Sequence, residues 1–259
     1  MERSRIISAN WFDYPQYYDI AFQAYTRSEA DFIVAACGKY CGFDAHRFLE
    51  PACGTGRLII ELAARGYQVI GFDLSQPALS YLRRHLARRR LQAEAFKAEM
   101  SDFRLGQPVD AAYCTISTFR HLLTEEAARG HLECIAGSLR PGGIYVLGLH
   151  LLPLDVDKED VLRWTTRRGE TKVTVTLRVL RIDLRRRLEN FRVSLLVRSA
   201  GRRKFACDTN FRSAPIRQGN FDGCWIRFRR WNCATFTTFG TTLSTRFLLT
   251  MKSPTMCSF

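Results

Sequence analysis

The segment 47–73 constrains the fold more than any other part of the chain. An apolar run at 47–49 leads into the turn-forming residues 50–56 (Glu-Pro-Ala-Cys-Gly-Thr-Gly), and a helical apolar stripe over 58–66 then closes on a glycine. The next apolar run, 68–73, ends in an aspartate. This order predicts a strand, a tight glycine turn, a helix and a second strand, which together form one βαβ unit of a parallel sheet.

The remainder of the first 150 residues continues the same alternation. A helix is expected to begin after the N-cap Ser75 and to run through Leu86, because leucines recur there at helical spacing. Apolar runs predict further strands at 91–97, 110–115 and 143–149, with a helix at 124–139 between the last two. The fold class is therefore α/β, with a mostly parallel, doubly wound sheet.

In such a sheet, ligands bind beyond the carboxyl ends of the strands, and here those ends carry the glycine turn, Asp73 and Glu99. A glycine turn before a helix, with an acid after the next strand, suits a cofactor that contains adenosine. A dinucleotide site would need a third glycine where this chain has Ile59. Glu50 would repel a pyrophosphate but suits a ligand that carries an ammonium and a sulfonium group. A lone Gly-x-Gly is more often only a turn, but its place at the switch point of the sheet favours the binding interpretation.

These features resemble the class I S-adenosylmethionine-dependent methyltransferases. The resemblance runs from about residue 17 to residue 150, and its best motif is 50–56 followed by 71–75 (Gly-Phe-Asp-Leu-Ser). Residues 17–20 and 29–32 also look like the amino-terminal helix that covers the cofactor in small-molecule members. The resemblance implies a Rossmann-like core over 1–150, S-adenosyl-L-methionine as cofactor, and methyl transfer to nitrogen or oxygen of a small molecule.

The resemblance also implies roles for individual residues. Gly54 and Gly56 would line the methionine and ribose of the cofactor, Asp73 would bind the ribose hydroxyls, and Glu99 with Met100 would bracket the adenine. Arg57 would pair with the cofactor carboxylate or, alternatively, be solvated. The predicted cofactor-binding residues are Glu50, Ala52, Cys53, Gly54, Gly56, Arg57, Asp73, Leu74, Glu99, Met100 and Cys114.

Four residues are candidates on the acceptor side. His121 is the candidate general base, and His150 stands near the expected pocket mouth, although each can equally be a structural histidine. Tyr17 and Tyr18 are either substrate contacts or packing aromatics. Alternatives to a small-molecule enzyme are an RNA- or protein-directed methyltransferase and a non-catalytic module. Nucleic acid is disfavoured as an acceptor, because a base-flipping site would need an Asn/Asp-Pro-Pro-aromatic motif and no Pro-Pro occurs in the chain.

The second half of the chain differs in character. The first 150 residues carry 17 basic and 16 acidic side chains, whereas residues 151–259 carry 22 and 9, so nearly all of the net charge of +14 lies there. Residues 172–179 alternate with period two, and 191–195 and 204–207 are further candidate strands. An antiparallel meander is predicted over 151–211, inserted after the fifth strand as a substrate lid or a homodimer surface. The alternating arginines favour a solvated face of this sheet.

After about residue 211 the periodic pattern ends. Residues 209–259 contain a single acid, Asp222, and the sixth and seventh strands expected from the resemblance are missing. We interpret 212–259 as an aberrant tail read out of frame, because a one-base shift restores acids and a plausible amphipathic helix. The alternative is a genuine basic tail that binds nucleic acid through Trp225, Phe228 and Trp231 among arginines.

The remaining features predict location and metal content. The first residues show no signal-peptide core and no apolar run is long enough to span a membrane, so a cytoplasmic protein is expected. The nine cysteines are then interpreted as reduced thiols. Cys37 and Cys41 have no partner at zinc spacing, and no metal is predicted.

Overall fold

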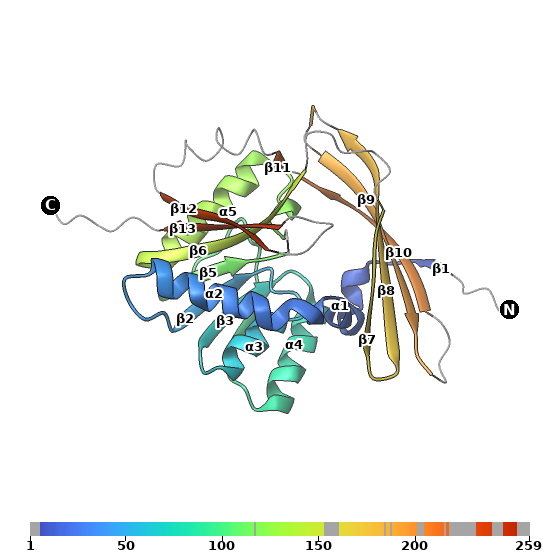
Figure 1. Cartoon of the computed structure of the whole chain (residues 1–259), viewed down its shortest axis with the longest axis horizontal. Helices are drawn as coiled ribbons and strands as arrows, with labels where there is room; N and C mark the ends of the chain where they lie inside the picture. The colour runs from blue at the N-terminus through green and yellow to red at the C-terminus, as the bar shows by residue number, and fades with distance from the viewer. Residues whose placement is uncertain are drawn as a thin grey trace.

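The computed structural model describes residues 6–116, 118–152, 161–183, 185–186, 188–200, 205–214, 216–217, 232–239 and 246–252. These residues form two β-sheets, and the helices gather around the larger one (Figure 1). Within these ranges no helix is long and apolar enough to cross a membrane.

The larger sheet has the strand order β12-β13-β6-β5-β2-β3-β4, and β11 pairs with β6 off this path. The five strands β2 to β6 are parallel, which confirms the predicted doubly wound α/β fold. The strands are β2 (Arg47–Pro51), β3 (Gln68–Asp73), β4 (Glu94–Lys97), β5 (Val109–Cys114), β6 (Leu139–Leu152), β11 (Ile216–Arg217), β12 (Asn232–Phe239) and β13 (Arg246–Lys252).

Helices cover both faces of this sheet. Two buried apolar clusters lie on its opposite faces, one under α5 and the other under α2, α3 and α4. The predicted cap is present at α4, where Ser75 Oγ accepts a hydrogen bond of 3.3 Å from the Ala78 N–H. The helices are α1 (Pro15–Phe22), α2 (Thr26–Tyr40), α3 (Arg57–Ala64), α4 (Gln76–Arg89) and α5 (Glu125–Ser138), with short 3₁₀ turns η1 (Trp11–Asp13), η2 (Gln23–Tyr25) and η3 (Thr118–His121).

The smaller sheet is the predicted antiparallel meander with one additional strand. Its order is β1-β10-β9-β8-β7, and β1 pairs in parallel with β10. Its inner face packs on η1 and α1, which lie between the two sheets (Figure 1). A strand of three residues leaves no periodic pattern, so the sequence did not indicate β1. The strands are β1 (Ile6–Ser8), β7 (Val161–Arg168), β8 (Thr171–Asp183), β9 (Leu188–Arg198) and β10 (Phe205–Ser213).

The expectation that two strands are missing beyond β6 is wrong. Strand β13 pairs antiparallel with β6, from Arg246 opposite His150 to Lys252 opposite Ile144, and β12 pairs antiparallel with β13. The apolar run Phe247-Leu248-Leu249 was missed because a strand with neighbours on both sides shows continuous rather than alternating apolar residues. The reading frame of the tail, in contrast, stays a prediction.

Candidate active site

The carboxyl ends of β2, β3 and β5 meet where the strand order reverses, and a tight loop lies at this point. The loop contains three residues with left-handed backbone, namely Ala52 (φ 50°), Gly54 (φ 54°) and Gly56 (φ 69°). Asp73 at the end of β3 fixes the loop, because its Oδ2 accepts a hydrogen bond of 2.7 Å from the Gly54 N–H. Its Oδ1 accepts one of 2.7 Å from the Ser75 N–H, so the carboxylate joins the loop to the start of α4.

The absent third glycine has a structural explanation. In this chain the small residue lies on the strand, at Gly71, and the large one on the helix, at Ile59. A Cβ built on Gly71 would lie 2.2 Å from Ile59 Cδ1. The close approach of helix and strand is therefore obtained with the two partners exchanged relative to the dinucleotide pattern.

Buried charges surround the loop. Glu50 is 8% exposed and accepts a hydrogen bond of 3.2 Å from the Tyr113 hydroxyl. Arg57, at the start of α3, forms an ion pair of 2.5 Å with Glu29 of α2, and both side chains are less than a tenth exposed. Arg57 also donates to Thr115 Oγ1 over 3.5 Å. The solvated alternative for Arg57 is therefore wrong, whereas its pairing with a cofactor carboxylate stays a prediction.

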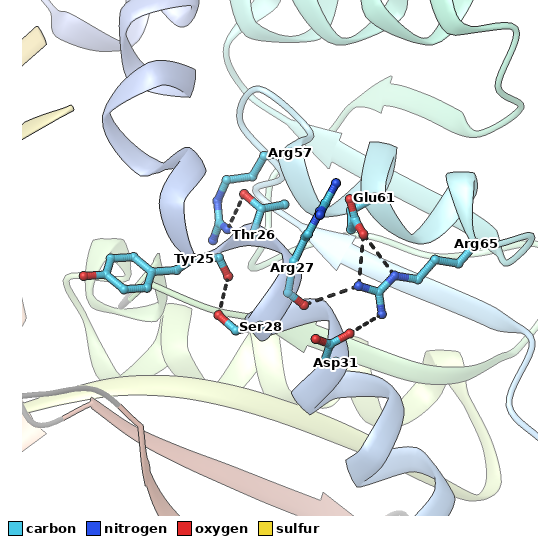
Figure 2. Close-up of polar contacts among 8 residues, drawn as sticks. All are labelled: Tyr25, Thr26, Arg27, Ser28, Asp31, Arg57, Glu61 and Arg65. Carbon is cyan, nitrogen blue, oxygen red and sulfur yellow. Dashed lines mark hydrogen bonds and ion pairs between the residues drawn. The ribbon is translucent and has the colours of Figure 1, made fainter. Parts of the chain in front are cut away.

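The first turns of α2 are fixed to α3 by two arginines (Figure 2). Arg57 donates to Thr26 Oγ1 over 3.3 Å, and Arg65, which directly follows the last residue of α3, pairs with Asp31 Oδ1 at 2.7 Å. Arg65 also contacts Glu61 of α3 at 2.9 Å. Helix α2 is thereby held against the core beside the glycine loop, and its role as a cover over the cofactor stays a prediction.

Carboxylates outnumber cationic groups around the glycine loop. Burial raises the pKa of Glu50 to about 8, Arg57 acts against this shift, and Glu29 and Asp73 add to it. Burial also raises the pKa of Tyr18 to about 12, and the same four charged groups act on its hydroxyl. The Tyr18 ring lies 4.9 Å from that of Trp11.

This arrangement fits a cofactor that carries positive charge. Three acidic side chains converge with a single guanidinium, and a Cβ built on Gly54 would meet nothing within 4 Å, so the loop is open on that side. Thr55 Oγ1 is buried and has no hydrogen-bond partner among the described residues, which leaves one donor of the loop unused. The ammonium and sulfonium of S-adenosylmethionine would complement such a site.

The other predicted cofactor residues lie at different depths. Leu74 is 55% exposed beside Asp73, and Glu99 is exposed, with Oε1 3.4 Å from the Ser101 hydroxyl. Met100, in contrast, belongs to a buried core cluster. The side chains of Cys53 and Cys114 are also buried in the core clusters, so their contribution to a ligand site would come from the backbone.

One buried histidine near the site was not indicated by the sequence. His131 of α5 is fully buried, with Nδ1 2.8 Å from the Met100 carbonyl and Nε2 2.7 Å from the Tyr145 hydroxyl. Because a carbonyl only accepts, Nδ1 carries the proton and Tyr145 donates to Nε2. Burial lowers the pKa of His131 to about 4, so the ring is neutral. The sequence around His131 in α5 did not indicate that its side chain is buried and hydrogen-bonded.

The residues predicted on the acceptor side do not lie together in one place. His121 lies at the end of η3, and its ring lies 6.0 Å from that of Phe12 and 5.8 Å from that of Phe211. Tyr17 is turned toward the smaller sheet, where its ring lies 5.6 Å from Phe205, so packing is its observed role. His150 pairs with Arg246 in the backbone of β6, and its side chain lies outside the described part of the structure.

Comparison with known proteins agrees with this geometry. Residues 48–143 match the methyltransferase domain family. A dTDP-3-amino-3,6-dideoxy-alpha-D-glucopyranose N,N-dimethyltransferase from Streptomyces fradiae is 31% identical over 161 residues, which are 61% of each chain. This chain thus matches about three fifths of the length of that relative.

Two solved structures share the fold over nearly the whole chain. The structure of DesVI from Streptomyces venezuelae has a TM-score of 0.78 at 21% identity and covers 95% of this chain and 99% of its own. The S-adenosylmethionine-bound structure of CalS10, an amino pentose methyltransferase from Micromonospora echinaspora, has a TM-score of 0.70 at 21% identity and covers 97% and 100%. The match over residues 48–143 marks the segment of the chain that is similar to the methyltransferase domain family, and the two solved structures show that the fold is shared.

Proposed function

We propose that this protein transfers a methyl group from S-adenosylmethionine to the amino group of a small sugar. The observation that carries the proposal is the set of Glu29, Glu50 and Asp73 beside one open glycine loop, because carboxylates at this place would be favoured in their ionised form by a cationic donor. The acceptor class is supported by the names of two similar proteins, which act on a dideoxy amino sugar and on an amino pentose.

The bound cofactor would supply a methyl group on a sulfonium, which is already activated for in-line displacement. The protein then has to orient the two reactants and exclude water. Asp73 would receive the ribose hydroxyls and Glu50 the ammonium. Helix α2, held by the Arg57–Glu29 ion pair, would cover the methionine end, and the Tyr18 hydroxyl would face the acceptor.

His121 would act as the general base that removes a proton from the acceptor. An amine attacks only through a free lone pair, so an acceptor that binds as an ammonium has to lose one proton first. Burial and the neighbouring Arg120 lower the pKa of His121, which keeps its imidazole neutral and able to take that proton at neutral pH. Methyl transfer then leaves a neutral thioether and the methylated acceptor as an ammonium, which carries the positive charge of the former sulfonium and can lose its proton to water.

The test has two stages. Calorimetric titration of the purified chain with S-adenosylmethionine should show one site, and Asp73→Ala should abolish it while the far-UV circular dichroism is unchanged. Incubation with radiolabelled cofactor and a panel of nucleotide-linked amino sugars should then label an amine. Labelling of RNA or protein instead would overturn the acceptor assignment, and equal binding by Asp73→Ala would overturn the site.

A cytoplasmic location and a homodimer through the smaller sheet are part of the proposal. Cell fractionation and sedimentation velocity test them directly. A sedimentation coefficient of a monomer at high protein concentration would contradict the dimer.

A further inference from the structure

Next to His121, the buried ion pair between Arg120 of η3 and Glu189 of β9 joins the two sheets of the molecule. Arg120 Nη2 donates to Glu189 Oε2 and, over 2.9 Å, to Ser213 Oγ of β10. Its guanidinium lies 5.0 Å from the centre of the Phe191 ring. The Arg120 carbonyl also accepts a hydrogen bond of 2.8 Å from the Ala214 N–H. The turn that ends in His121 is thus attached to the smaller sheet by side chain and backbone.

A buried ion pair at this place is not the arrangement that would stabilise the fold most. The Arg120 side chain is 11% exposed and that of Glu189 is fully buried. Arg120 Nε and Glu189 Oε1 have no hydrogen-bond partner among the described residues, so two buried polar atoms are left unsatisfied. An apolar pair of the same size would be expected to stabilise the junction as well or better. A role beyond stability is therefore indicated.

We propose that Arg120 and Glu189 are positioning residues that hold the His121 turn at the acceptor side and keep its imidazole ready to accept a proton. This inference rests on the proposed function, because it needs His121 at the acceptor. It adds that the smaller sheet takes part in the chemistry through Glu189, and is more than a cover over the substrate.

The charges around His121 support the inference. The elements that contact its ring contribute Phe12 from η1 and Phe211 from β10, and the charged residues next to them, Asp13 and Arg212, are exposed. Burial lowers the pKa of His121 and the positive charge of Arg120 lowers it further. Glu189 offsets the charge of Arg120 at close range. Removal of Arg120 should therefore raise the pKa of His121, and removal of Glu189 should lower it.

The experiment is an NMR titration of the histidine side chains, with His121→Gln used to assign the His121 signal. Arg120→Met should raise the pKa of His121 by roughly half a unit, and Glu189→Gln should lower it by a similar amount. Arg168→Met is the matched control, because Arg168 also joins the smaller sheet to the rest of the chain, through Asp19 at 2.7 Å, and should leave His121 unchanged.

Loss of one buried partner can unfold a protein, so the double variant Arg120→Met/Glu189→Leu completes the set. It should fold, bind the cofactor as the wild type does, and lose at least about tenfold in kcat, since the turn is no longer held in place. Unchanged His121 pKa values in the folded single variants, or a wild-type kcat in the double variant, would overturn the inference. If the two single variants shift the pKa of His121 in opposite directions but the wild-type protein methylates no amine, the result counts against the proposed function alone.

Discussion

Gly54 and Gly56 both have left-handed backbone but differ in what a side chain would meet. A Cβ at Gly56 would lie 2.3 Å from Leu82 Cδ1, whereas one at Gly54 would meet nothing within 4 Å. Ala52 already adopts φ 50° in this loop, so an alanine is tolerated there. The two glycines therefore serve different purposes, one in packing against α4 and the other in leaving room for a ligand.

The corresponding alanine variants should separate stability from binding. Gly54→Ala should lower the free energy of unfolding by about 1 kcal/mol, the strain of a left-handed alanine, and should weaken cofactor binding because the new methyl group enters the open side. Gly56→Ala should cost roughly 3 kcal/mol, since overpacking against Leu82 adds to that strain. Urea denaturation and cofactor titration measure both. Wild-type cofactor affinity in Gly54→Ala would contradict the assignment of the open side.

Glu50 should couple cofactor binding to pH. Its pKa of about 8 means that the side chain is mostly protonated at pH 7, and a bound cation favours the ionised form. Binding at pH 7 should then release close to one proton per site, and cofactor affinity should rise with pH until it levels off above about pH 8. Calorimetry in buffers of different ionisation enthalpy counts the protons. Glu50→Gln is the control and should release none; proton release that persists in this variant would assign it to another group.

At the scale of elements, His131 joins α5, β6 and the loop after β4. Its native pKa of about 4 lies below the ordinary 6.5, so between these values the unfolded chain binds a proton that the native chain does not. The free energy of unfolding should therefore fall as the pH drops from 6.5 to 4, by up to about 3 kcal/mol from this group. His131→Gln should be less stable at pH 7 but show a flatter pH dependence. If the free energy of unfolding, measured with urea at each pH, depends on pH in the same way for the two proteins, this role of His131 is refuted.

The elements of the first half could be predicted because their signals are local. The Ser75 cap, the acid that ends β3 and the glycines of the loop each act within a few residues, and the structure has them as expected. The ion pair of Arg120 and Glu189 could not be predicted, because its partners are 69 residues apart and only the packing of the two sheets brings them together. For the same reason the sequence suggested His121 as a base but not what holds it.

At the scale of the molecule, α1 connects the two sheets. Asp19 Oδ2 accepts hydrogen bonds from the Tyr81 hydroxyl of α4 at 3.0 Å and from Arg168 of β7 at 2.7 Å. The Trp164 indole of β7 donates to the Ala21 carbonyl over 3.1 Å. Tyr18, which we propose as a contact of the acceptor, directly precedes Asp19 on this helix. Movement of the smaller sheet would therefore be transmitted to the acceptor side.

The tail provides the last prediction, which concerns the gene. Strands β12 and β13 complete the larger sheet, yet residues 209–259 contain one acid against 24 in the first 208 residues. Selection for a soluble surface maintains acids along a whole chain, whereas a shifted frame has no such constraint. Sequencing an independent clone should reveal a one-base shift near codon 216. The restored protein should carry more acids after that codon and a higher melting temperature, because native side chains would then pack on β6. An unbroken frame through codon 259 would contradict the shift and assign the basic tail to the protein itself.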